Sequence, residues 1–421
     1  MSMEVALVVF ALLCVLASRY MHGTYFHPVG VLAIVVAFAM FGKLTLTSFS
    51  SADSFAQYCI VILLAACVLL PLGSLAPPRS FGLETGLTRL GTAIVAASAF
   101  LGAFAGLAVQ IAAGRSVSLD LASLMEGAEQ ASVVRYSSGT SAAALVSISF
   151  AGVFLAAMLA PYAASMRNPI VRSLLLASPI IGAVLYAMLT TARAPFTIAV
   201  ALLAASWMGR ELLKHGNRAR VPPRTALMVI LISAGVVIIF AGASFIRYGG
   251  VTPQTTEIVR ARLGTYAFGA LPAFDQWLLG ADVPPIGTGV AWIPSAPSPS
   301  SAIAQFAQIG NGVSTNVYTA LRTFIEGWGS IGGAIAVLVF LTLAIFAYRR
   351  VIEHGQVRAG MLFACLTGFL LYFCYAPVFE FSNYAAAAVV GVAFAPALVL
   401  TRRLDTRPAI DAQRLPNHER H

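Results

Sequence analysis

Charged residues are scarce in this sequence. They make up 10% of the 421 residues, whereas hydrophobic residues make up 59%. A soluble domain carries about 25% charged residues, so this composition excludes an ordinary soluble protein. Apolar runs of roughly 17–25 residues recur, and this is the length that a helix needs to cross a bilayer. The runs lack the strict alternation of barrel strands, so we predict an all-α polytopic membrane protein.

Paired cysteines and metal-binding clusters are also missing. All five cysteines fall within apolar runs, where they are typical of small buried hydrophobic residues: Cys14, Cys59, Cys67, Cys365 and Cys374. We therefore expect no disulfide framework. No group of cysteines and histidines has the spacing of a zinc site, and we expect neither a metal nor another cofactor.

The apolar runs predict about eleven transmembrane helices. They lie near residues 3–18, 28–46, 56–76, 91–113, 141–164, 170–190, 194–212, 225–246, 329–348, 359–377 and 383–400. The chain then divides into spans 1–8 (residues 1–246), a large loop (247–328), spans 9–11 (329–400) and a basic tail (401–421).

The basic residues predict the orientation of these spans. Most of the 26 Lys and Arg residues fall on the side that holds the tail, and such an excess marks the cytoplasmic side. The N-terminus would then lie outside and the C-terminus inside. The net charge of +10 would face an anionic leaflet, so it does not indicate nucleic-acid binding. All six histidines also fall on the inner side in this topology, which leaves no imidazole chemistry for the outer side.

The large loop is the longest connection in the predicted topology. A connection of roughly 80 residues is far above the usual length, and such loops are functional or disordered. This one is rich in aromatic and aliphatic residues, which argues against disorder. We predict a folded cap over a membrane-embedded site.

Arg193 is the most informative outer residue. It lies at a tight turn between two spans, and Pro195 follows in the first turn of the next helix. The orientation rule gives no reason for a basic residue there. A guanidinium at a helix N-terminus forms an anion site that suits a phosphate. The alternative is an arginine that reaches outward to lipid headgroups.

Four further arginines fall in the large loop: Arg247, Arg260, Arg262 and Arg322. Arginine can bind a phosphate through two parallel hydrogen bonds. The group is therefore a candidate for holding a diphosphate and stabilising it as it leaves. The alternative for each arginine alone is solvation or an ion pair with a neighbouring carboxylate.

Carboxylates and aromatic rings supply the other candidates. Asp275, Glu326 and Glu380 could act as the general base that helps transfer to a hydroxyl. Glu326 lies four residues after Arg322, so a helix would pair the two, and this is the simpler interpretation of Glu326. Three aromatic residues offer faces on which a sugar could stack, although Trp and Tyr also gather at membrane interfaces without a ligand: Tyr266, Tyr318 and Trp277.

The end of the large loop resembles that of Wzy-type O-antigen polymerases. The similarity covers Asn316-Val317-Tyr318-Thr319, a following aromatic and aliphatic stretch, and Glu326-Gly327-Trp328-Gly329, in which Gly327 departs from the family pattern. Tyr266 with Gly269 and Phe274, and Arg193 at an outer turn, are further similarities.

The resemblance implies a metal-independent glycosyltransferase of the bacterial inner membrane, similar to the GT-C class. Such an enzyme would transfer a growing glycan from undecaprenyl diphosphate to the terminal sugar of a new lipid-linked repeat on the periplasmic side. Arg193, and less surely Arg262 and Arg322, would grip the diphosphates. The implied partners are undecaprenyl-diphosphate-linked oligosaccharides, membrane lipids and a chain-length regulator protein.

Two alternatives stay open. An O-antigen ligase would transfer finished glycan to lipid A–core, but that family has a functional histidine in its large outer loop, and this loop has none. A transporter or flippase would carry charged residues deep within several spans. This sequence instead gathers its charge at the ends of the spans.

Overall fold

The structure is a computed structural model of the chain. It describes residues 2–73, 83–112, 143–190, 194–220, 235, 238, 241, 245, 251–281, 283–286, 307–310, 313–315, 319–375, 378 and 382–403.

Helices make up most of this part of the chain. They are α1 (Met3–His22), α2 (Pro28–Leu46), α3 (Asp53–Leu69), α4 (Arg89–Ala112), α6 (Ala143–Leu159), α7 (Pro169–Thr190), α8 (Ala194–His215), α10 (Pro253–Phe268), α11 (Ala270–Gly280), α12 (Ala320–His354), α13 (Val357–Tyr372), α14 (Ser382–Ala393) and α15 (Ala395–Leu398). Short 3₁₀ helices follow α3, α6 and α8: η1 (Leu70–Gly73), η2 (Ala160–Ser165) and η3 (Gly216–Arg218). Two antiparallel strand pairs complete the fold: β1 (Leu83–Leu87) with β4 (Val399–Arg403), and β2 (Ala307–Gln308) with β3 (Ser314–Thr315).

The helices have the length and composition of membrane spans. Among the described residues, seven helices are long and apolar enough to cross a bilayer, and three shorter apolar helices accompany them. Helices occupy every predicted range except residues 225–246, which lie mostly outside the described residues. A mostly helical membrane protein, as the composition predicted, is therefore confirmed.

One face of α12 shows what surrounds the bundle. Three apolar side chains spaced four residues apart are more than half exposed on this face: Ile331, Ile335 and Val339. The opposite face, with Val337 and Leu341, is fully buried. An exposed apolar stripe along a helix of this length is expected where the solvent is lipid.

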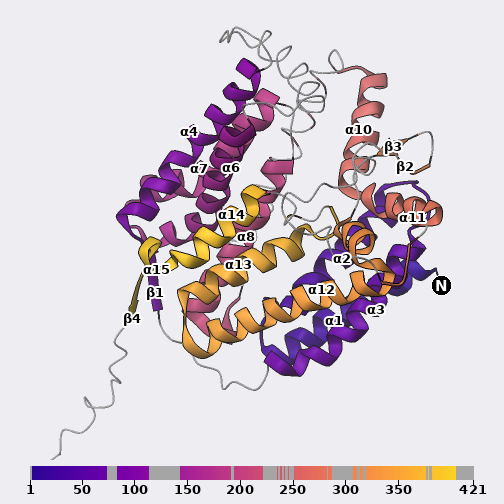
Figure 1. Cartoon of the computed structure of the whole chain (residues 1–421), viewed down its shortest axis with the longest axis horizontal. Coiled ribbons are helices and arrows are strands. Elements are labelled where there is room, and N and C mark those ends of the chain that lie inside the picture. Colours follow the sequence, from indigo (N-terminus) through magenta and orange to yellow (C-terminus); the bar gives the residue numbers. More distant parts are fainter. Residues whose placement is uncertain are drawn as a thin grey trace, which may run out of the picture.

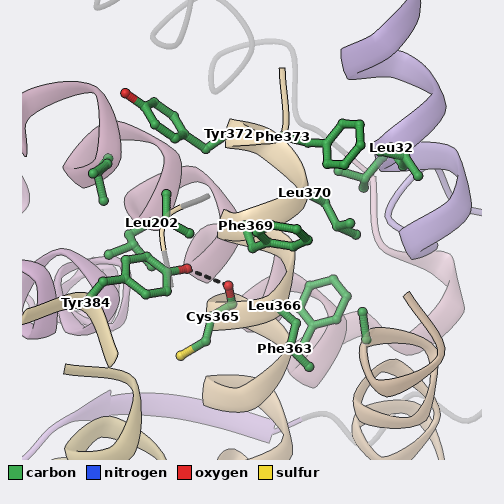
Figure 2. Packing of buried hydrophobic residues seen from close by; sticks show 14 of the residues in the cluster. Leu32, Leu202, Phe363, Cys365, Leu366, Phe369, Leu370, Tyr372, Phe373 and Tyr384 are labelled. Carbon is green, nitrogen blue, oxygen red and sulfur yellow. Dashed lines mark hydrogen bonds between the residues drawn. The ribbon is translucent and has the colours of Figure 1, made fainter. Parts of the chain in front are cut away.

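α13 lies at the centre of the bundle, and nearly all of its residues are buried. Figure 2 shows Tyr384 of α14 donating a hydrogen bond of 2.6 Å to the backbone carbonyl of Cys365 in α13. The tyrosine can come so close because Gly368 leaves room for its hydroxyl, 2.9 Å from where a Cβ would stand. The polar tip of a buried ring is thus satisfied inside an apolar core.

α4 and α7 approach each other closely. A Cβ on Gly102 would collide with the backbone of Gly182, and a Cβ on Gly182 would collide with the carbonyl of Ser98. The two helices are also joined by a buried hydrogen bond of 3.0 Å between the side-chain hydroxyls of Ser98 and Ser178. Small residues that let helices approach, with a hydroxyl bridge between them, are the usual means of joining helices in a membrane.

The strand pair β1–β4 corrects the predicted last span. The helical part ends at Leu398, and Val399–Arg403 pairs with Leu83–Leu87, so the span does not continue to residue 400. Hydropathy could not locate this change, because a short apolar run suits a strand as well as a helix. Thr88 extends the pairing by donating its hydroxyl to the carbonyl of Ala397 at 2.8 Å.

Figure 1 shows two distinct ends of the bundle. α10, α11 and the β2–β3 pair gather with the N-terminus at one end, which we call the cap end. The β1–β4 pair marks the opposite end, which we call the clasp end. The orientation predicted from the basic residues would place the cap end outside.

Replacing Gly182 by alanine should lower the free energy of unfolding by about 1–3 kcal/mol, the usual cost of overpacking. The new methyl group would press on the backbone of Ser98, which cannot rotate away. Thermal unfolding of the detergent-solubilised protein measures this change. Gly280→Ala is the control, because no atom of the described residues outside its own stretch of helix lies within 4 Å of its Cβ position. Equal melting temperatures for the two variants would contradict the close approach of α4 and α7.

Candidate functional site

The candidate site lies at the cap end, where the large loop meets the bundle. The described parts of the predicted loop form α10, α11 and the β2–β3 pair. The backbone N–H of Ser50 donates to the carbonyl of Ile309 at 2.9 Å. Ile309 is fully buried and packs with Ala273 of α11. The cap is therefore attached to the α2–α3 turn.

Asp275 joins α11 to the first turn of α3. One carboxylate oxygen accepts the N–H of Ser54 and the other accepts the N–H of Phe55, both at 2.8 Å. Ala52 is the N-cap residue of α3 and has no side chain that could accept these donors. The first amides of a helix need acceptors and attract negative charge. Asp275 thus caps α3 from a distant part of the chain.

The surroundings of Asp275 have two opposing effects on the pKa of its carboxyl group. Burial raises the pKa of Asp275, and the backbone N–H groups of Ser54 and Phe55 oppose that shift, leaving the pKa above its usual value. Both oxygens are already occupied by amide donors. This geometry favours a structural role for Asp275 over the general-base role considered from the sequence.

A second carboxylate binds the same turn. Glu4 of α1 accepts the N–H of Ala52 at 2.6 Å and the ammonium of Lys43 at 2.5 Å. Glu4 and Lys43 are both nearly buried. Sequence reasoning did not single out this pair, although a lysine at the end of an apolar span on the outer side was a signal of the same kind as Arg193. The ion pair joins α1, α2 and α3 at the cap end.

Gly329 divides α12 into a short helix, residues 320–328, and a long one, residues 330–354. Its φ of 80° and ψ of 174° are not helical. A Cβ at Gly333 would stand 2.9 Å from the backbone nitrogen of Ile325, whereas residues eight apart in one straight helix are about 12 Å apart. The short helix therefore turns back against the long one.

The loop after α11 holds this reversal in place. Ser330 donates its N–H to the carbonyl of Pro284 at 2.9 Å, and Ile331 donates to that of Pro285 at 3.1 Å. A Cβ at Gly329 would come within 2.7 Å of the backbone of Ile286. Only glycine satisfies both the positive φ and this close approach.

Arg322 lies on the short helix and is 3% exposed. Its Nε donates to Glu326 at 2.7 Å, which confirms the predicted pairing four residues apart. Its guanidinium also lies over the ring of Trp277 on α11, 5.2 Å from the ring centre. A cation stacked on an indole and bonded to a carboxylate is stabilised on two sides. Three of the predicted site residues are therefore in contact.

Three other predicted residues lie on α10. Arg260 and Arg262 are exposed, and Tyr266 is 36% exposed. The buried residues of α10 include Phe268, whose ring fills the space beside Gly42 of α2. The two arginines therefore stand on the open side of the cap, where a ligand can reach them.

Four predicted site residues lie outside the described residues: Arg193, Arg247, Tyr318 and Glu380. The first turn of α8, directly after Arg193, can still be located. Thr197 and Tyr372 of α13 share a hydrogen bond of 2.9 Å, and the next residue, Phe373, accepts the N–H of Ala320 at 3.0 Å. The N-termini of α8 and of the short helix therefore flank the same end of α13.

Removing the Asp275 carboxylate should cost about 0.5–2 kcal/mol of unfolding free energy, the usual value for a lost helix cap. Asp275→Asn retains one acceptor oxygen and should lose less than Asp275→Ala. Unfolding of the purified variants, with Glu257→Ala on the exposed side of α10 as the control, measures the effect. A wild-type melting temperature for Asp275→Ala would show that the cap is held in another way.

Comparison of the chain with protein-family models, with curated proteins and with solved structures finds no match, so the geometry of the cap end carries the functional argument.

Proposed function

We propose that this chain is an O-antigen polymerase. It polymerises undecaprenyl-diphosphate-linked oligosaccharide repeat units on the periplasmic face of the bacterial inner membrane. The observation that carries the proposal is the group formed by Arg322, Trp277 and Glu326 under a folded cap at one end of an apolar bundle. This group fixes an indole face on which a sugar can stack, under the cap that also carries the exposed Arg260 and Arg262, and arginines can stabilise a leaving diphosphate.

The proposed topology has eleven spans, with a periplasmic N-terminus and a cytoplasmic C-terminus. The spans occupy residues 1–246 and 329–400, the cap occupies residues 247–328, and residues 401–421 form the cytoplasmic tail. The cap end would then face the periplasm, where lipid-linked repeats are polymerised. In support, β4, the last described element before the tail in the sequence, lies at the clasp end, away from the cap.

The arginines of the cap end divide into two groups in this proposal. Arg193, just before α8, and the exposed Arg260 and Arg262, together with Arg247, bind the diphosphates. Buried Arg322 holds Trp277 in place through its ring contact and is itself oriented by Glu326. A guanidinium that is already bonded to a carboxylate is better suited to positioning than to capturing a second anion.

The remaining candidates would bind the sugar or act as the general base. Trp277, Tyr266 and Tyr318 provide stacking faces for the repeat unit. Glu380, which follows α13 in the sequence, is the strongest remaining candidate for the general base. Asp275 and Glu326 are engaged by amide and guanidinium donors respectively.

The distribution of charge favours an enzyme over a transporter. Buried ionic groups in the described helices of membrane-spanning length lie toward the helix ends and are paired, as in Glu4–Lys43 at 2.5 Å and Arg210–Glu211 at 2.8 Å. A transport path needs charged or polar groups near the middle of several spans. Chemistry at the rim of the bundle agrees better with this pattern.

Arg193→Ala should abolish long O-chains and leave a core bearing a single repeat, because the diphosphate loses its main cation. The test complements a gene-deletion strain and reads the lipopolysaccharide ladder on a gel, with membrane levels of the protein measured in parallel. Arg167→Ala is the control, since it removes the same charge from an exposed position before α7. Normal chain length in Arg193→Ala would remove Arg193 from the site.

The deletion strain itself separates the alternatives. A single-repeat band supports the polymerase. A bare core with lipid-linked polymer would instead indicate a ligase, and lipid-linked repeats left facing the cytoplasm would indicate a flippase.

Glu326→Gln should retain long O-chains, because glutamine can still accept the hydrogen bond from Arg322 Nε that orients the guanidinium. Arg322→Gln should shorten the chains strongly, since Trp277 loses the cation that lies over its ring. The same ladder assay reads both variants. Loss of polymer in Glu326→Gln at normal membrane levels would make Glu326 the general base and would overturn the positioning role.

A further inference from the structure

A second cationic site lies at the clasp end, far from the cap. A cavity of about 450 Å³ opens there between the α1–α2 turn and η3. Its lining consists of Arg19, Gly23, Asn217, Arg218 and Arg220, with no carboxylate among these residues. Cavities of roughly 300–1,000 Å³ accommodate small ligands.

Hydrogen bonds and glycine turns shape this cavity in advance of any ligand. Thr24 is buried; its hydroxyl donates to the carbonyl of Ala219 at 3.0 Å and accepts the N–H of Phe26 at 3.2 Å. Gly23 and Gly216 have φ values of 71° and 58°, which let the two turns bend sharply. A Cβ at Gly23 would stand 3.3 Å from the carbonyl oxygen of Asn217, so the turns lie against each other.

Packed rings make the α1–α2 turn rigid. His22 and His27 flank the turn, and their rings stack with centroids 4.0 Å apart and planes within 2°. Tyr348 of α12 packs its edge against His27 at 5.1 Å. All three side chains are buried. Arg19, in the last turn of α1, is therefore presented by a fixed backbone, and its guanidinium lies over the ring of Tyr25 at 5.2 Å.

The three arginines of the cavity, of which Arg19 is half-buried and Arg218 and Arg220 are exposed, differ from several other arginines of the fold. Arg210, Arg322 and Arg349 each bond to a glutamate, at 2.8, 2.7 and 2.8 Å. Within the part of the chain that the structure describes, Arg19, Arg218 and Arg220 form no ion pair with a carboxylate. Three guanidinium groups around one cavity attract an anion, and their planar forks match the oxygens of a phosphate.

The chemistry of the ligand follows from the guanidinium donors that line the cavity. A free phosphate and the phosphodiester of a lipid headgroup both present the anionic oxygens that such donors bind.

We propose that this cavity binds a phosphate group, with Arg19, Arg218 and Arg220 as its cationic ligands. The site is separate from the glycosyl-transfer site and does not depend on it. The orientation predicted from the basic residues places it at the cytoplasmic leaflet, whose anionic lipids carry this group. A free phosphate from the cytosol would offer the same chemistry.

Two measurements test the proposal and distinguish the two sources. The first follows the melting temperature of the detergent-solubilised full chain against inorganic phosphate, with chloride at equal ionic strength as the reference. The second compares the melting temperature in nanodiscs of phosphatidylglycerol and of phosphatidylcholine. Arg218→Gln/Arg220→Gln should weaken the apparent affinity about tenfold or more, as expected when charge-assisted hydrogen bonds are lost.

Arg167→Gln is the matched control, because it removes one charge from an exposed position that does not line the cavity. Arg220→Gln alone serves if the double variant does not fold, since Arg220 is exposed and follows η3. Stabilisation by both probes identifies a general phosphate site, and stabilisation by phosphatidylglycerol alone identifies a headgroup site. Stabilisation by neither probe, or an equal loss in Arg167→Gln, overturns the proposal.

Discussion

The cap end depends on one contact, the carboxylate of Asp275 at the N-terminus of α3. The first amides of a helix cannot be satisfied within that helix, and leaving them buried and unbonded costs free energy. Ala52 cannot satisfy them from its own side chain. Asp275 does so with both oxygens, and the N–H of Ala52 is bound by Glu4. The hydrogen bonds from Asp275 to the first amides of α3 therefore attach α11 to the bundle. Because Trp277 lies on α11, the same contact also positions its ring.

Trp277 and Arg322 come together because two constraints meet. Asp275 positions α11, and the reversal at Gly329 turns the short helix back toward it. A cation in a largely apolar setting is costly unless it is paired. Glu326 and the indole ring together supply that pairing, so the site is stable in the absence of a ligand. Binding a lipid diphosphate would then depend on the more exposed arginines of the cap.

The two ends of the bundle treat their cations differently. At the cap end the buried cations Lys43 and Arg322 each have a carboxylate partner at 2.5 and 2.7 Å. At the clasp end Arg19, Arg218 and Arg220 surround a cavity without an acidic lining residue. Excess positive charge is what retains a segment on the cytoplasmic side during insertion. In the proposed topology, the same excess would supply the cations of the proposed phosphate site where the two turns meet.

The amino-acid sequence by itself determined that the protein is embedded in a membrane and mostly helical. Both properties follow from the length and hydropathy of the apolar runs, which do not depend on contacts between distant residues. It also determined the Arg322–Glu326 pair, since a spacing of four residues brings side chains together on any helix. Only the tertiary structure decided the role of Asp275, whose amide partner Phe55 is 220 residues away, and the end of the last span, where Val399 leaves the helix to pair with Leu87. Contacts between distant segments depend on how whole helices pack against each other. The residues near Ser54 or Val399 in the sequence do not show which distant segment will supply the partner of an unpaired amide or strand.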